Sequence, residues 1–168
     1  NSGDFTVLLG LNGAGKTTTM RMITGYLAPT SGSASICGHD IEKDSLEAKK
    51  HLGYLPEGAP LYPDLSPQLF LDFVGRSRGM DATHIKERID FVVNTLHLEP
   101  VLDQAIDTLS KGFKRRVGLA QAILHDPDVL ILDEPTDGLD PIQKHEVRGL
   151  IKNMAKDKAI IISTHILE

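Results

Sequence analysis

The chain has 168 residues, 40% of them hydrophobic, so it can bury one core and a small appended subdomain. Its net charge of −5 gives no overall basic field, and we expect no nucleic-acid partner. The longest apolar runs, 129–132 and 159–162, are far shorter than the ~20 residues of a membrane-spanning helix. The sequence begins without the features of a secretory signal, and its single cysteine, Cys37, cannot form an internal disulfide. A cytosolic location is therefore expected.

A glycine-rich segment near the start, 10–18, fits the pattern G-x-x-x-x-G-K-[ST]. It follows an apolar run, 5–9, and precedes a proline-free stretch, 17–27, so the sequence predicts a strand, a loop and a helix. Glycine lets backbone N–H groups approach a triphosphate, and a helix N-terminus attracts the same anion. Lys16 would reach the β- and γ-phosphates, and the Thr17 hydroxyl would bind Mg²⁺. The residues expected to contact the nucleotide here are Gly10, Asn12, Gly13, Ala14, Gly15, Lys16, Thr17 and Thr18. The alternative is a glycine-rich turn between two core elements.

The other elements follow in chain order. Short strands are expected at 34–37 and 51–55, with a turn at 38–40 and a short helix at 45–50 between them. Strands resume at 129–132 and 159–162, separated by a helix at 141–156 whose apolar side carries Ile142, Leu150, Ile151 and Met154. The middle of the chain lacks strand signals and predicts helices instead. Two apolar faces are expected there: Leu69, Phe70, Phe73 and Val74 on one helix, and Ile85, Ile89, Val92, Val93 and Leu96 on the next.

These elements predict an α/β fold with a mostly parallel sheet, because the strands read as continuous apolar runs that are buried on both faces. Residues 1–60 and 125–168 would form this core, and 61–124 an inserted helical subdomain. Ligands of such sheets bind at the carboxyl ends of the strands.

Two acidic residues, Asp133 and Glu134, end the apolar run 129–132. If this strand neighbours the strand before the glycine loop, Asp133 would lie in the Mg²⁺ shell and Glu134 within reach of an attacking water. The alternative is an ordinary acidic edge between a strand and a loop.

A basic cluster begins the helix expected at 111–124, with Ser110 as its N-cap. Its members are Lys111, Lys114, Arg115 and Arg116. Cations at a helix N-terminus oppose the helix dipole, which favours an anion docking there. A solvated basic face is the alternative.

In order, these segments resemble the nucleotide-binding domain of an ABC transporter. The matching segments are the Walker A loop 10–18, a glutamine-loop equivalent 54–57, the signature 109–113, Walker B through Glu134, the D-loop 137–140 and the switch histidine in 163–165. The resemblance implies a P-loop NTPase (RecA-like) core that takes ATP and Mg²⁺. The segments 54–57 and 61–63 are similar to exporters of the ABC-2 type, including the gliding-motility and multidrug branches.

The resemblance also implies roles for single residues. Two such domains, identical or different, would pair head to tail, so that Ser110 and Gly112 of one chain meet the γ-phosphate held by Lys16 of the other. Glu134 would be the general base. The remaining roles are His165 on the γ-phosphate, Asp140 in communication across the dimer, and Asp133 and Glu57 at the metal.

The chain departs from the family pattern at Leu11, Lys111, Phe113 and Glu57. It also lacks the upstream aromatic residue that stacks on adenine and looks truncated at both ends, so we expect weak nucleotide binding and slow turnover by the isolated chain. The leading interpretation is the ATPase subunit of a membrane exporter, peripheral on the inner face of the membrane and bound to a permease. The alternatives are a soluble ABC ATPase of DNA repair or translation, and a nucleotide-binding module without turnover.

Overall fold

The computed structural model of the chain describes residues 5–10 and 13–164. These residues form two compact units, which are described separately. The sheet unit comprises the described residues of 1–57, 127–135 and 154–168, and the helical unit comprises 58–126 and 136–153.

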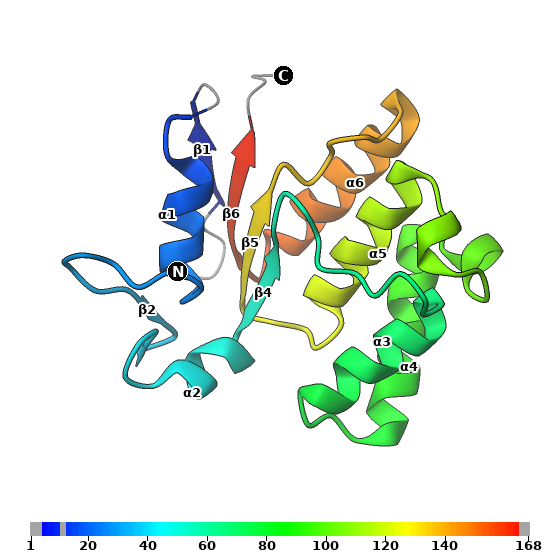
Figure 1. The fold of residues 1–168 in the computed structure, drawn as a ribbon, viewed down its shortest axis with the longest axis horizontal. Helices are drawn as coiled ribbons and strands as arrows, with labels where there is room; N and C mark the ends of the chain where they lie inside the picture. The colour runs from blue at the N-terminus through cyan, green and yellow to red at the C-terminus, as the bar shows by residue number, and fades with distance from the viewer. Residues whose placement is uncertain (1–4, 11–12, 165–168) are drawn as a thin grey trace. The chain divides into compact units, whose positions relative to one another are not determined.

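A four-stranded parallel sheet is the centre of the sheet unit (Figure 1). Its strands are β1 (Phe5–Leu9), β4 (Leu52–Leu55), β5 (Val129–Asp133) and β6 (Ala159–Thr164), in the order β1-β6-β5-β4. Helix α1 (Lys16–Ile23) follows β1. The predicted apolar runs are confirmed as strands. The assumption that the strand before the glycine loop (β1) is adjacent to the strand that ends in Asp133 (β5) is wrong. Strand β6 pairs with both β1 and β5 and lies between them.

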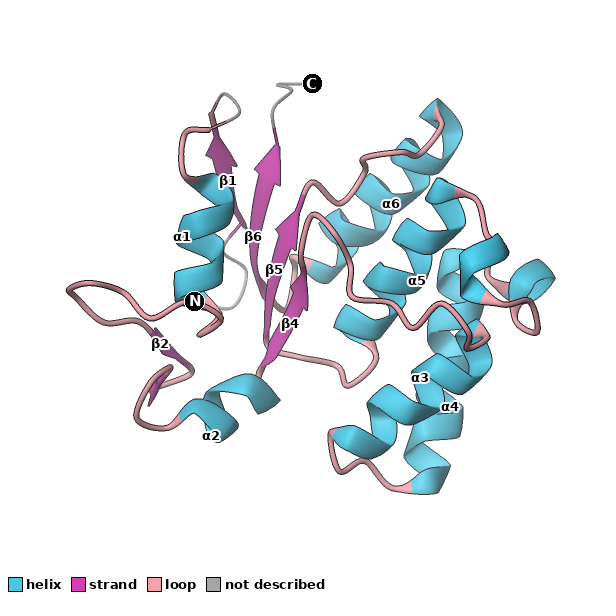
Figure 2. Ribbon diagram, in the orientation of Figure 1, coloured by secondary structure: helices cyan, strands magenta, loops and turns pink. Residues whose placement is uncertain are grey.

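A small hairpin and a short helix lie between α1 and β4. Strands β2 (Ser35–Ile36) and β3 (His39–Asp40) are antiparallel, and α2 (Ser45–Lys50) follows them (Figure 2). The prediction of a turn over 38–40 is therefore wrong in part, because the turn lies one residue earlier, at Cys37 and Gly38. Both have positive φ, 51° and 87°, as a two-residue hairpin turn requires. Hairpin, α2 and sheet share one core, formed by Met20, Ile36, Ile41, Ala48, Leu52, Tyr54 and Ile131.

The helical unit contains the α-helices α3 (Pro67–Ser77), α4 (Ala82–Leu96), α5 (Lys111–Ile123) and most of α6 (Pro141–Met154), with 3₁₀ turns at Glu99–Val101 and Ile106–Thr108. Asp81 begins α4 by accepting hydrogen bonds from the backbone N–H groups of Thr83 and His84 at 3.1 and 3.0 Å. None of the helices in the described ranges has the length and apolar character needed to cross a bilayer.

The apolar faces agree with the sequence prediction on one helix and differ on two. All five residues predicted for α4 are buried. On α3, Leu69 and Phe73 are 59% and 47% exposed, because the buried stripe runs through Phe70, Leu71 and Val74. On α6, Ile142 is 74% exposed, and the buried positions are Val147 and Ile151, one helical turn apart.

Candidate functional site

The glycine loop connects the carboxyl end of β1 to α1, as the sequence predicts. Gly13 and Gly15 have φ of 85° and 86°, in the left-handed region that favours glycine. An added Cβ would meet no atom within 4 Å at either position, so backbone conformation rather than space requires glycine there. The Lys16 ammonium donates a hydrogen bond to the Gly10 carbonyl at 2.5 Å. The loop thus holds Lys16 at the helix N-terminus, where an anion would bind.

Asp133 and Glu134 are tied to the end of β6. Asp133 is 1% exposed and accepts a hydrogen bond from the Ser163 hydroxyl. The Glu134 backbone N–H donates to the Ser163 carbonyl and hydroxyl oxygens, both at 3.2 Å. Glu134 has φ of 49°, a conformation that is uncommon for a residue other than glycine. Such backbone strain is typical of functional positions.

The sheet brings these segments to one edge. Leu9 is in register with Thr164, and Asp133 with Ser163. Because all four strands are parallel, the glycine loop, Glu134 and the segment after β4 that carries Glu57 leave from the same edge. With β6 between them, β1 and β5 lie two strand spacings apart, about 9–10 Å. Asn12, Leu11 and His165 lie outside the described residues.

The donor groups at this edge suit Mg²⁺. Thr17, in the first turn of α1, offers a hydroxyl, and Asp133 and Glu57 offer carboxylates. Mg²⁺ prefers hard oxygen ligands and binds proteins through one or two carboxylates together with substrate phosphates. The residues present therefore fit this metal.

Ser110 begins α5 in the helical unit, as predicted. Its hydroxyl oxygen accepts a hydrogen bond from the Phe113 N–H at 3.3 Å. Gly112 is buried, and an added Cβ would lie 3.0 Å from Gln143 Oε1. Asp140 accepts a hydrogen bond from the Gln143 N–H at 2.9 Å, so it caps α6. The signature segment and the D-loop thus pack together within one unit.

Two of the four cations in the basic cluster on α5 are buried, so the cluster as a whole is not a solvated basic face. Lys111 forms an ion pair with Asp137 at 2.7 Å, and this hydrogen bond lowers the pKa of Asp137. Arg115 and Arg116 are only 6% and 7% exposed. Arg116 donates to the Leu96 carbonyl at 3.0 Å, and its guanidinium lies 4.5 Å from the centre of the Phe113 ring.

Three cations of the cluster, Lys111, Lys114 and Arg116, therefore bind groups inside the helical unit. Arg116 satisfies the carbonyl end of α4, where a cation is favoured by the helix dipole. Lys114 donates to the Asp107 carbonyl at 2.8 Å. The prediction of an anion at Ser110 and Gly112 then depends on the helix N-terminus and not on this charge.

Comparison with known proteins decides the family. Residues 1–137 match the ABC transporter family. The chain belongs to this family. The predicted resemblance and the α/β P-loop fold are thereby confirmed. A solved structure of the ATP-binding subunit of an ABC transporter superposes with a TM-score of 0.89 at 32% identity, covering 98% of this chain and 69% of that one.

Several curated ABC proteins are similar in sequence. An uncharacterized ABC transporter ATP-binding protein, YhcH of Bacillus subtilis, is 42% identical over 168 residues, covering 98% of this chain and 54% of the relative. The Nod factor export ATP-binding protein I of Paraburkholderia xenovorans is 40% identical, covering 96% and 53%. A probable multidrug ABC transporter ATP-binding protein, YbhF of Escherichia coli, is 38% identical, covering 99% and 29%. The chain thus spans about half the length, or less, of these relatives.

Sequence reasoning overlooked two contacts at the ABC motifs. Ser163 was part of the switch-histidine segment, but its hydrogen bonds to Asp133 and Glu134 depend on β6 lying beside β5. The Lys111–Asp137 ion pair joins residues 26 positions apart. Contacts between residues so far apart in the sequence follow no helical or strand periodicity and could not be predicted from it. The opposite charges of Lys111 and Asp137 were the one available signal, because they allow an ion pair.

Proposed function

We propose that this chain binds and hydrolyses ATP as the nucleotide-binding part of an ABC exporter. The observation that carries this proposal is one sheet edge on which the glycine loop with Lys16 is joined by Asp133 and Glu134. Phosphate-binding N–H groups, an ammonium and two carboxylates are the groups that phosphoryl transfer to water requires. Family membership supports the same reaction.

The proposed roles follow from the position of each group. The N–H groups of the loop and the Lys16 ammonium bind the β- and γ-phosphates of ATP. Glu134 takes the proton of the attacking water, and its strained backbone, held by Ser163, supports a fixed orientation of the carboxylate. His165 would contact the γ-phosphate, since it directly follows β6 in the sequence.

The oxygen donors of Thr17, Asp133 and Glu57 would hold Mg²⁺. When bound, the metal neutralises negative charge on the β- and γ-phosphates. Thr17→Val should therefore abolish the gain in ATP affinity that Mg²⁺ produces. Thr19→Val is the matched control, because the exposed Thr19 hydroxyl bonds only to the Gly15 carbonyl among its described contacts. Equal Mg²⁺ dependence in both variants would argue against this assignment.

We further propose a head-to-tail dimer in which Ser110 and Gly112 of a second copy, or of a related chain, contact the γ-phosphate held by Lys16. The N-terminus of α5 supports this, because the exposed Ser110 hydroxyl lies at a helix N-terminus, whose first backbone N–H groups attract anions. Asp140, which starts α6 beside the signature, would couple the two chains.

A membrane permease is the proposed partner of the helical unit, and the inner face of the membrane is the proposed location. Tyr62, Leu69 and Phe73 are 52%, 59% and 47% exposed, and the Tyr62 and Phe73 ring centres lie 5.4 Å apart. Such a group of exposed apolar side chains supports docking of another chain. Two of the similar proteins carry export or multidrug transport in their names, which favours an exporter over a soluble ATPase of repair or translation.

The test is Mg²⁺-dependent ATP hydrolysis by the complete protein with its membrane partner. Glu134→Gln should lower turnover ~100-fold or more while ATP still binds, because only the general base is lost. Lys16→Ala should abolish ATP binding. Glu146→Gln, at an exposed site on α6, is the matched control and should behave as wild type. Wild-type turnover by Glu134→Gln would refute the proposed mechanism.

A further inference from the structure

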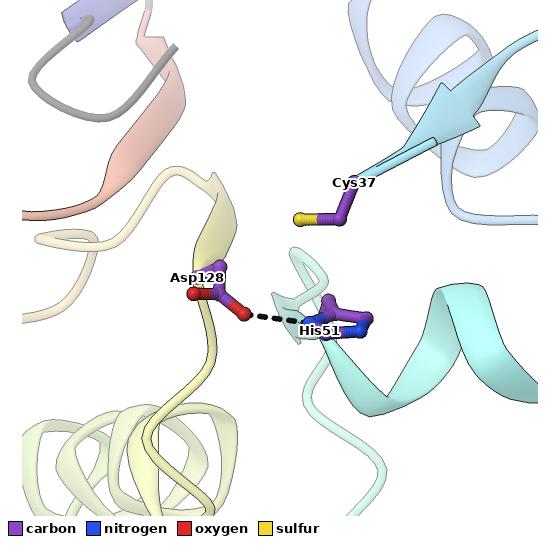
Figure 3. A group of neighbouring side chains, drawn as sticks. All are labelled: Cys37, His51 and Asp128. Carbon is purple, nitrogen blue, oxygen red and sulfur yellow. Dashed lines mark hydrogen bonds and ion pairs between the residues drawn. The ribbon is translucent and has the colours of Figure 1, made fainter. Parts of the chain in front are cut away.

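Three side chains with metal-binding atoms lie close together in the sheet unit, at a place separate from the glycine loop (Figure 3). They are Cys37 in the turn between β2 and β3, His51 at the residue before β4, and Asp128 at the residue before β5. One ligand atom from each lies within 4.8 Å of the others. His51 and Asp128 precede their parallel strands, so they lie at the amino-end edge of the sheet, opposite the edge that carries the ATP site.

We propose that Cys37, His51 and Asp128 form a binding site for a Zn²⁺-class divalent cation. Thiolate, imidazole and carboxylate are the three ligand types that Zn²⁺ takes in proteins. The thiolate and imidazole favour such a metal over Mg²⁺ or Ca²⁺, which prefer oxygen alone. Three protein ligands leave a fourth tetrahedral position for water.

The geometry needs only a small adjustment. Bonds of ~2.0–2.3 Å in a tetrahedral site place the donor atoms about 3.3–3.8 Å apart. His51 Nδ1 and Asp128 Oδ2 are now hydrogen bonded at 2.6 Å, so they must separate by about 1 Å to admit the ion. Cys37 and Asp128 are exposed and His51 is partly exposed, so the ion can enter without opening the core.

The surroundings orient the ligands. Cys37 has φ of 51° in the hairpin turn, a strained conformation for cysteine, and Figure 3 shows its sulfur pointing into the space beside the His51–Asp128 pair. The ring of His39 stacks on His51 with ring centres 5.7 Å apart and planes 8° apart. His39 is itself held by Asp44 through a 2.5 Å hydrogen bond. The His51 ring is thus fixed from one side before any metal binds.

Partial desolvation is the main cause of a raised pKa of the Cys37 thiol, and the negative charge of Asp128 is the second. The effect of Asp128 agrees with the short distance between the two side chains. Binding exchanges the thiol proton for the metal, so one proton passes to solvent and the thiolate–metal bond forms. In the neutral imidazole, the Nδ1 proton that His51 donates to Asp128 transfers through solvent to Nε2, which leaves Nδ1 able to bind the ion. The bound ion would join the hairpin, the start of β4 and the start of β5. Any ligand that binds only the folded state stabilises it, so Zn²⁺ should raise the melting temperature of the chain.

The test uses the complete chain, freed of metal with a chelator, and titrated with Co²⁺ as a coloured substitute for Zn²⁺. We expect one Co²⁺ per chain and a thiolate-to-cobalt charge-transfer band, which Zn²⁺ then removes by displacement. Cys37 is the single cysteine, so the band reports on this site alone. A titration without the band, or with one Co²⁺ shared by two chains, would overturn the proposal.

Variants assign the ligands. Cys37→Ser should abolish the band, and His51→Gln and Asp128→Asn should each weaken Co²⁺ binding at least tenfold, since even second-shell partners of metal ligands have effects of 10–100-fold. His84→Gln and Asp90→Asn, both exposed on α4, are the matched controls and should bind as wild type. If His51→Gln and Asp128→Asn both bound Co²⁺ with wild-type affinity, the Cys37 thiol would be the single ligand and the proposed site would be refuted.

One measurement avoids any effect of a substitution on folding, and a second separates the two proposed sites. In the unmodified chain, Zn²⁺ should slow alkylation of Cys37 at least tenfold, and Mg²⁺ should not; equal alkylation rates would contradict the proposal. ATP binding by Cys37→Ser should equal that of wild type, because the two sites occupy opposite edges of the sheet. Failure of the zinc site would therefore leave the proposed ATPase intact, and the converse also holds.

Discussion

The Ser163 hydroxyl donates a hydrogen bond to the Asp133 carboxylate, and the same hydroxyl oxygen accepts one from the Glu134 backbone N–H at 3.2 Å. Ser163 is completely buried and Asp133 is 1% exposed. One hydroxyl on β6 thus positions both acidic residues at the end of β5.

Ser163→Ala removes this hydroxyl from a buried carboxylate and a backbone donor. We expect the free energy of unfolding to fall by about 1–3 kcal/mol, because a lost bond to a buried polar group is not replaced by water. The urea midpoint measures this change. Ser33→Ala, at an exposed loop position, is the control and should alter stability by less than about 0.5 kcal/mol. An unchanged midpoint in Ser163→Ala would mean that the hydrogen bonds contribute little.

Gly112→Ala should have little effect on stability but a large effect on ATP turnover, and this difference tests the proposed phosphate contact. The new methyl would lie 3.0 Å from Gln143 Oε1, the end of a flexible side chain that can move aside. The loss from this contact opposes the gain from replacing glycine in a helix, so stability should change by less than about 1 kcal/mol. ATP turnover by the proposed dimer should fall about tenfold or more, because a methyl pressing on Gln143 shifts the start of α5 and misaligns its N–H groups with the phosphate. Full turnover with normal stability would exclude Gly112 from the interface.

The Lys111–Asp137 ion pair should make stability depend on pH. The hydrogen bond from Lys111 is the main cause of the lowered pKa of Asp137 in the folded chain. A lowered folded pKa stabilises the protein at pH above the unfolded value of about 3.9, and the effect is lost as pH falls through the folded pKa.

The melting temperature of wild type should therefore exceed that of Asp137→Asn by a constant amount above about pH 5, and the difference should vanish in acid. Calorimetry from about pH 6 to pH 2 measures it. Asp64→Asn, at an exposed loop position, serves as the control for adding an amide. A difference that grows in acid would have the wrong sign for this explanation.

Two glycines in helix interiors should respond to alanine in opposite directions. At Gly75 a new Cβ would lie 2.7 Å from Ile85 Cγ1, a branched side chain that cannot move freely, so Gly75→Ala should cost about 1–3 kcal/mol. At Gly149 no atom lies within 4 Å, and Gly149→Ala should stabilise the chain by about 0.5–1 kcal/mol. Urea unfolding measures both. In a double-mutant cycle with Ile85→Ala, the penalty at Gly75 should shrink; an unchanged penalty would locate the strain elsewhere.

The sequence by itself determined the local elements and the chemistry that they carry. The glycine loop before α1, the Ser110 cap of α5 and the buried face of α4 were predicted, because torsion preferences, capping and helical periodicity act between residues close in the chain. On α3 and α6, helical periodicity predicted the wrong set of buried residues. Leu69 and Ile142 have apolar side chains but are exposed.

Only the tertiary structure decided which distant residues meet. It inserted β6 between the strand of the glycine loop and the strand of Asp133, and it placed Arg116 on the end of α4 and Asp128 beside His51. The physical reason is that strand order and charge pairing depend on long-range packing, for which several partners are chemically equivalent. An apolar strand has the same sequence pattern beside either neighbour, and an arginine can pair with any carbonyl or carboxylate that the fold brings within reach.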